Sequence, residues 1–96
     1  MFARMATFEV DDPDLIDGEV DTTRRFTEGG GLPEGIPAVG FLMMVDRTSR
    51  KVVEVLLFET EEELQEGDAT LNAMAPGDGS MHRTALDVFE VPVHMP

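Results

Sequence analysis

Cysteine, basic residues and long apolar runs are what this sequence most clearly lacks. None of its 96 residues is a cysteine, which excludes disulfides and thiolate metal sites. No stretch approaches the roughly 20 apolar residues that a membrane-spanning helix needs. The opening Met1-Phe2-Ala3-Arg4 is not followed by the apolar run of a signal peptide. With no cysteine to protect and no export signal, we expect a cytoplasmic protein.

Positive charge is scarce as well. Only 7 basic residues stand against 20 acidic ones, so the formal net charge is −13. Such a surface repels phosphate backbones and anionic headgroups, and we therefore expect neither nucleic acid nor a membrane as a partner. A solubilising surface explains the acidity, and adaptation to a salty cytoplasm is the alternative.

The length predicts one domain over residues 1–96, because natural domains run from roughly 50 to 250 residues. A chain this short buries only about three fifths to two thirds of its unfolded surface, so its core is marginal without an added constraint. Disulfides cannot be this constraint, because the sequence has no cysteine. Oligomerisation is the source of added stability that remains.

The first quarter of the chain predicts a strand and a helix. Residues 2–9 are aromatic or tolerant of a strand and contain no breaker. Asp12 is a good N-cap and Pro13 suits the first helical position, so a helix is predicted to begin there. Apolar residues then recur in steps of three and four from Leu15 to Phe26. The glycines at 29–31 end the pattern.

A hairpin is predicted next. Residues 38–45 are nearly all apolar, which predicts a strand buried on both faces. A polar turn follows at 46–50, and residues 51–59 form a second run rich in valine and leucine. The two runs therefore predict an antiparallel pair.

The last third predicts a helix and a closing strand. Thr60 and Glu63 fit a capping box, and residues 76–79 contain the proline and glycines that end a helix. A strand over 81–93 contains Pro92, which cannot donate to a ladder and therefore places the end of this strand at an edge or beyond its sheet. The order is β-α-β-β-α-β, the pattern of an α+β, ferredoxin-like fold with a four-stranded antiparallel sheet.

Four segments carry a resemblance to a known family. They are residues 2–9, 40–47, 57–64 and 88–94. These segments resemble the antibiotic-biosynthesis-monooxygenase-like (ABM-like) group of the dimeric α/β-barrel superfamily. The resemblance implies two subunits packed sheet against sheet, with the last strand reaching towards the partner. The residues agree, because a lone subunit would expose a large apolar sheet face, which soluble monomers rarely tolerate.

The same resemblance implies two kinds of activity. The group contains cofactor-independent oxygenases acting on aromatic polyketides, and haem-degrading enzymes with a Trp and a His on the second helix. Residues 60–74 contain neither, and the whole sequence lacks Trp and Tyr, which argues against haem chemistry and weakens the oxygenase interpretation. We expect a homodimer that binds a small apolar or aromatic molecule, or has an accessory role, and needs no cofactor. A cofactor-independent monooxygenase acting on a small aromatic substrate is the alternative.

Three polar residues interrupt the apolar strands and are the candidate site residues: Arg4, Glu54 and Asp87. The implied sheet order has the first strand between the third and the fourth. If all three share a face, one guanidinium meets two carboxylates. This arrangement would be a polar anchor in a ligand cavity, a buried structural ion pair, or a pair between subunits. Arg4 and Glu54 have the same numbering parity along their strands, which a bulge would change. No residue is assigned a catalytic role.

No metal site is expected. In an extended strand, at about 3.3 Å per residue, His82 and His94 would be near 40 Å apart, and Glu90 and His94 about 13 Å apart. The acidic run at 12–17 lacks the closing glutamate of a calcium loop.

Overall fold

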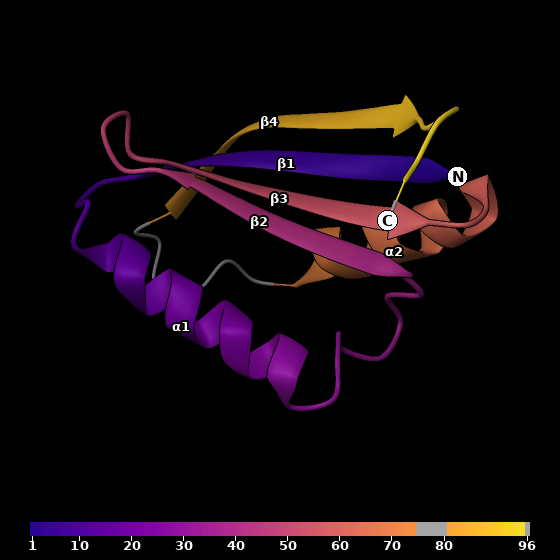
Figure 1. The fold of residues 1–96 in the computed structure, drawn as a ribbon, viewed down its shortest axis with the longest axis horizontal. Helices are drawn as coiled ribbons and strands as arrows, with labels where there is room; N and C mark the ends of the chain where they lie inside the picture. The colour runs from indigo at the N-terminus through magenta and orange to yellow at the C-terminus, as the bar shows by residue number, and fades with distance from the viewer. Residues whose placement is uncertain (75–80, 96) are drawn as a thin grey trace.

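The computed structural model describes residues 1–74 and 81–95. Within them the chain forms β1 (Phe2–Val10), α1 (Leu15–Glu28), β2 (Gly40–Asp46), β3 (Lys51–Phe58), α2 (Glu61–Ala73) and β4 (Met81–Glu90) (Figure 1). The strands form one antiparallel sheet in the order β2-β3-β1-β4. The ferredoxin-like fold predicted from the sequence is confirmed, including the place of the first strand between the third and the fourth. The predicted helix end at 76–79 lies outside the described residues.

Helix α1 begins two residues later than predicted. The prediction placed the cap at Asp12 and the first turn at Pro13, but the helix begins at Leu15, after Asp14. The Asp12 carboxylate accepts a hydrogen bond from the Asp14 N–H at 2.9 Å, and its carbonyl accepts one from the Leu15 N–H at 3.0 Å. Asp12 therefore closes a turn that leads into the helix, as aspartates do when their side chains bond the backbone two residues on. Gly29 follows the helix, as predicted.

Helix α2 begins where the sequence predicts. The Thr60 hydroxyl accepts a hydrogen bond from the Glu63 N–H at 3.2 Å, with Thr60 itself in an extended conformation. Leu64 and Gly67 are the buried residues of this helix. A Cβ at Gly67 would lie 2.7 Å from two ring carbons of Phe58. The absence of a side chain at 67 therefore lets the helix approach the sheet.

Within the single chain, the predicted second strand is buried on one face only. The side chains of Phe41 and Met43 pack against the core, but Leu42 is 52% and Met44 is 44% exposed. Strand β2 lies at an edge of the sheet, and its second face is left without cover among the described residues. The apolar run therefore predicted the strand correctly, and the burial of its second face depends on what covers that side of the sheet.

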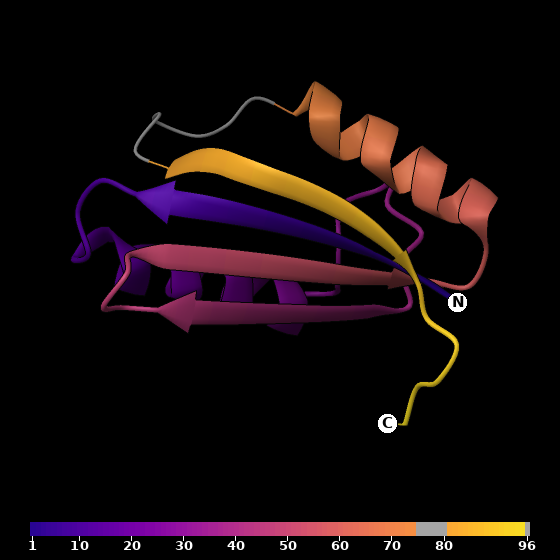
Figure 2. The same cartoon turned by 90° about the horizontal axis from the view of Figure 1, so that it is seen from above.

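Strand β4 ends at Glu90, three residues before the predicted end. The Val91 N–H still donates to the Met1 carbonyl at 2.8 Å, and Pro92 follows, which cannot extend the ladder. The remaining residues leave the sheet on the side away from α2 (Figure 2). The predicted position of this strand at an edge is confirmed.

Both helices lie against one face of the sheet, and the core beneath them is divided in two. One cluster joins α2 and the connection before β2, through Ile36, Leu56, Phe58 and Leu64. The other joins α1 to the opposite end of the strands, through Val10, Ile16 and Val52. No helix among the described residues is long and apolar enough to cross a membrane.

Candidate functional site

Two of the three candidate residues lie on the helix-facing side of the sheet, between the two core clusters. Arg4 pairs with Leu56, and Glu54 pairs with Ala6 two positions along β1. Residues two apart on a strand face the same side, so Arg4 and Glu54 share a face. Asp87 pairs with Met5 and therefore faces the other side of the sheet. The expected arrangement of one guanidinium and two carboxylates is thus not formed by these three residues.

The buried guanidinium of Arg4 finds its partners on helix α2 instead. Arg4 is only 4% exposed. Its Nε donates to Asp68 Oδ1 at 2.8 Å and its Nη2 donates to Asn72 Oδ1 at 3.3 Å. Asp68 and Asn72 are one helical turn apart, and the Asn72 amide in turn donates to Asp68 Oδ2 at 3.3 Å. A charge-assisted pair of this kind satisfies a cation that would otherwise be costly to bury.

A second guanidinium reaches the same amide oxygen. Arg83 Nη1 donates to Asn72 Oδ1 at 2.9 Å. The register of β4 against β1 shifts between Thr7 and Phe8, so Arg83 rather than Thr84 pairs with Phe8. This irregularity turns the Arg83 side chain to the helix-facing side, as bulges commonly do. We call Arg4, Asp68, Asn72 and Arg83 the polar cluster.

Sequence reasoning found Arg4 but missed the rest of the polar cluster. Asp68 and Asn72 are spaced by four within a predicted helix, which places them on one face. That spacing was a usable signal for the pair. Nothing in the sequence indicated the strand shift that brings Arg83 to it.

Glu54 is half-buried on the helix-facing side of the sheet, near the polar cluster. Its pKa is raised, first by burial, then by the negative charge of Glu19 on α1, and the raise is partly offset by Arg4. Burial and a like charge both disfavour the ionised carboxylate. Glu54 therefore holds its proton to a higher pH than an exposed glutamate does.

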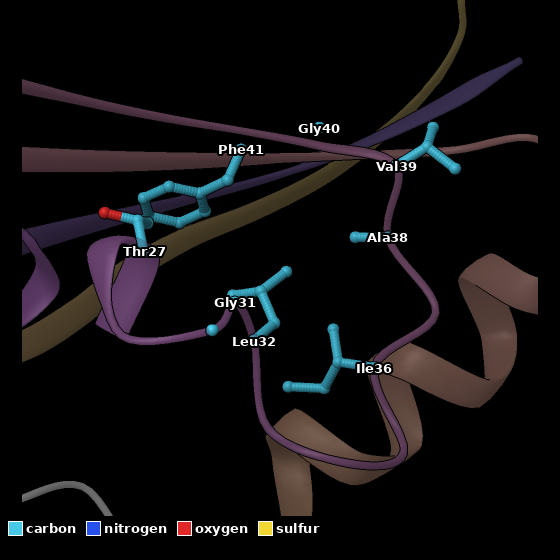
Figure 3. A pocket seen from close by; sticks show the side chains of 9 residues that line it. Thr27, Gly31, Leu32, Ile36, Ala38, Val39, Gly40 and Phe41 are labelled. Carbon is cyan, nitrogen blue, oxygen red and sulfur yellow. The ribbon is translucent and has the colours of Figure 1, made fainter. Parts of the chain in front are cut away.

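An open hollow of about 410 Å³ lies beside the start of β2. It is formed by the end of α1, the loop after it and the first residues of the strand (Figure 3). Gly30 and Gly31, in this loop, have φ of 125° and 100°, a backbone region that favours glycine. Neither Arg4 nor Glu54 belongs to the lining. The lining residues are Thr27, Gly30, Gly31, Leu32, Ile36, Ala38, Val39, Gly40 and Phe41.

The other side of the sheet is largely apolar and carries no helix of the described residues (Figures 1 and 2). The register places nine apolar side chains on this side of the sheet. The charged side chain of Asp87 lies on the same side. We call this surface the open face. Its apolar members are Ala3, Met5, Leu42, Met44, Val53, Val55, Leu57, Ala85 and Phe89.

No family model, curated protein or solved structure matches this chain. Within residues 1–74 and 81–95, no group of three or more histidine, aspartate or glutamate side chains is placed to hold a metal ion. Function must therefore be inferred from three features of the molecule itself. These are the open face, the hollow beside Phe41, and the polar cluster with Glu54.

Proposed function

We propose that the chain is a homodimer, packed open face to open face, that binds a small apolar or aromatic molecule in the hollow beside Phe41. The open face is the observation that carries this proposal. The fold class and the sequence resemblance to ABM-like proteins support the same assembly. Because the chain contains no cysteine, the cytoplasm is the compartment we infer.

The open face has the composition of an interface. Its apolar part reaches from Leu42 on the edge strand β2 to Phe89 on the edge strand β4, each about half exposed. At one end of the face, Lys51 pairs with Glu9 on one neighbouring strand and with Asp46 on the other. Stable interfaces combine an apolar centre with a polar rim in this way. Burying such a face stabilises the dimer by about 25 cal/mol per Å² of apolar surface removed from water. A chain this short needs such added stability.

The hollow suits a small apolar ligand. Its volume falls within the roughly 300–1,000 Å³ that is typical of ligand pockets. Leu32, Ile36 and Phe41 form apolar walls. The Thr27 hydroxyl is already engaged, because it donates to the backbone carbonyls of Thr23 and Arg24. The lining also exposes polar atoms, so a ligand there would contact both apolar side chains and polar groups.

Sedimentation equilibrium of three proteins tests the dimer. The wild type is expected to have the mass of two chains, and Leu42→Lys the mass of one, because the lysine charge would be buried against apolar side chains of the interface. Leu15→Lys, on the exposed surface of α1, is the control and should remain a dimer. A wild-type mass of one chain at micromolar concentration would defeat the proposed assembly.

Methyl NMR tests the ligand. With 1-naphthol as the probe, we expect saturable shifts of the Leu32 and Ile36 methyl signals. Ala38→Leu fills the hollow and should abolish them, whereas Ala69→Leu, on the exposed side of α2, should not. If the probe instead shifts Leu42 and Leu57, it binds the open face and the hollow is not the site.

Glu54 favours a second candidate, a cofactor-independent monooxygenase. A half-buried carboxylate beside Arg4 could take a proton from an acidic C–H of an anthrone-type substrate. The CH₂ group of the substrate would become C=O with one oxygen atom of O₂, and the other oxygen atom would leave as water with the two hydrogens of the CH₂ group. Oxygen uptake with anthrone tests this candidate. Equal rates for wild type and Glu54→Gln would remove Glu54 from the chemistry, and no uptake would remove the candidate.

A further inference from the structure

We propose that Arg4 and Arg83 form a binding site for a small carboxylate between helix α2 and the sheet. This site differs from the hollow beside Phe41 in position and in ligand chemistry. It does not depend on the proposed function. The elements that build it are β1, β4 and α2.

The two guanidiniums are held together by one atom. Asn72 Oδ1 accepts from Arg4 Nη2 at 3.3 Å and from Arg83 Nη1 at 2.9 Å. Because a single oxygen accepts from both, two cationic side chains from different strands are brought side by side. A pair of guanidiniums is the arrangement that recognises carboxylates, which accept several hydrogen bonds at once.

Both side chains keep donors for a ligand. A guanidinium has five N–H groups, and Arg4 uses one on Nε and one on Nη2 within the described residues. Its Nη1 makes no hydrogen bond to the described part of the chain, yet no buried side-chain nitrogen there is left without a partner. Arg4 as a whole is only 4% exposed. Arg83 is exposed, and within the described residues only its Nη1 donates a hydrogen bond.

The charge balance of the cluster depends on Glu54. The charged members of the polar cluster are Arg4 on β1, Arg83 on β4 and Asp68 on α2. Two further carboxylates act on it from outside, Glu54 on β3 and Glu19 on α1. Asp68 neutralises one arginine. An ionised Glu54 would offset part of the charge of the other arginine, and the raised pKa of Glu54 extends to higher pH the range in which it does not. A bound carboxylate and an ionised Glu54 thus compete, so removing the Glu54 charge should raise affinity at a pH where the ligand stays ionised.

A purely structural role accounts poorly for this cluster. It separates the two apolar core clusters of a chain whose core is already small. Buried ion pairs contribute less to stability than well-packed apolar residues in the same volume. Local features that lower stability in this way are typical of functional sites.

Titration of the full chain with propionate, and with propionamide as its neutral isostere, tests the site. Neither molecule has an aromatic ring, so failure here leaves the hollow beside Phe41 untouched. We expect saturable shifts of the Nε–H signals of Arg4 and Arg83 in ¹⁵N NMR with propionate and none with propionamide. At neutral pH, where propionate is ionised, Glu54→Gln should tighten binding because the competing carboxylate is removed.

Two charge-matched variants decide the outcome. Arg83→Gln should weaken propionate binding about tenfold, since charge-assisted hydrogen bonds are lost. Arg24→Gln removes the same charge from the exposed surface of α1 and should leave binding unchanged. Equal weakening by both variants would mean that propionate responds only to net charge. That result, or linear shifts without saturation, would overturn the site. Circular dichroism confirms that each variant is folded.

Discussion

Replacing Gly67 with alanine tests the close approach of helix α2 to the sheet. Two opposing effects act at this position. Alanine in a helix interior is favoured over glycine by roughly 1 kcal/mol. The new Cβ, however, would lie 2.7 Å from Cε1 and Cζ of Phe58, whose side chain is completely buried.

The packing effect should win at Gly67. Overpacking a filled core costs about 1–3 kcal/mol. Gly18 on α1 supplies the matched control, because a Cβ there meets no atom within 4 Å and only the helical gain applies. We therefore expect Gly67→Ala to be less stable than Gly18→Ala by about 1–3 kcal/mol, with the wild type between them or level with Gly67→Ala.

Thermal unfolding followed by far-ultraviolet circular dichroism measures this difference, since the chain has no Trp or Tyr for fluorescence. In a domain of this size, 1 kcal/mol corresponds to about 4–8 °C in Tm. All proteins should be compared at one concentration, because dimerisation would shift Tm. If Gly67→Ala melts as high as Gly18→Ala, α2 does not pack on Phe58 as described.

Three further substitutions test other features. Thr60→Ala should lower stability by about 0.5–2 kcal/mol in urea denaturation, because the hydroxyl that caps α2 is lost; Thr22→Ala, exposed on α1, should cost less. Glu54→Gln should stabilise the protein at neutral pH. The pKa of Glu54 is raised in the folded state above its ordinary value of 4.5. Its contribution to folding stability is therefore fully present below pH 4.5 and is lost as the pH rises through the folded-state pKa. Urea midpoints of the two proteins should therefore converge in acid, and a constant difference would contradict this. Asp87→Asn should tighten the proposed dimer in sedimentation, since a charge with no ion pair to the described residues is removed from the open face; weaker association would show that Asp87 has a partner there.

The fold could be predicted because its signals are local. The cap at Thr60, the turn between β2 and β3 and the apolar runs each act within a few residues. The burial of β2 could not be read from the same signals. An apolar strand has one pattern whether its second face is covered by a helix, by a partner or by nothing, and Leu42 shows that the described chain does not cover it.

The candidate site was predictable only in part. Arg4 and Glu54 share a numbering parity, but it is the register of β1 against β3 that places them on one face. The partner of Arg4 depends instead on how α2 crosses the sheet, which brings Asp68 to it. The side on which Arg83 lies depends on a one-residue shift in register. Neither relation leaves a periodic trace in the sequence.

Helix α1 is fixed to the sheet by a single fully buried side chain, Ile16. An element with so few buried contacts opens at a lower free energy than the strands beneath it. Its amide hydrogens should therefore exchange well before those of β1 and β3. Because Thr27, at the end of this helix, is a wall of the hollow beside Phe41, the volume available there varies with each opening. A ligand that contacts both Thr27 and Phe41 would slow the exchange of the whole helix.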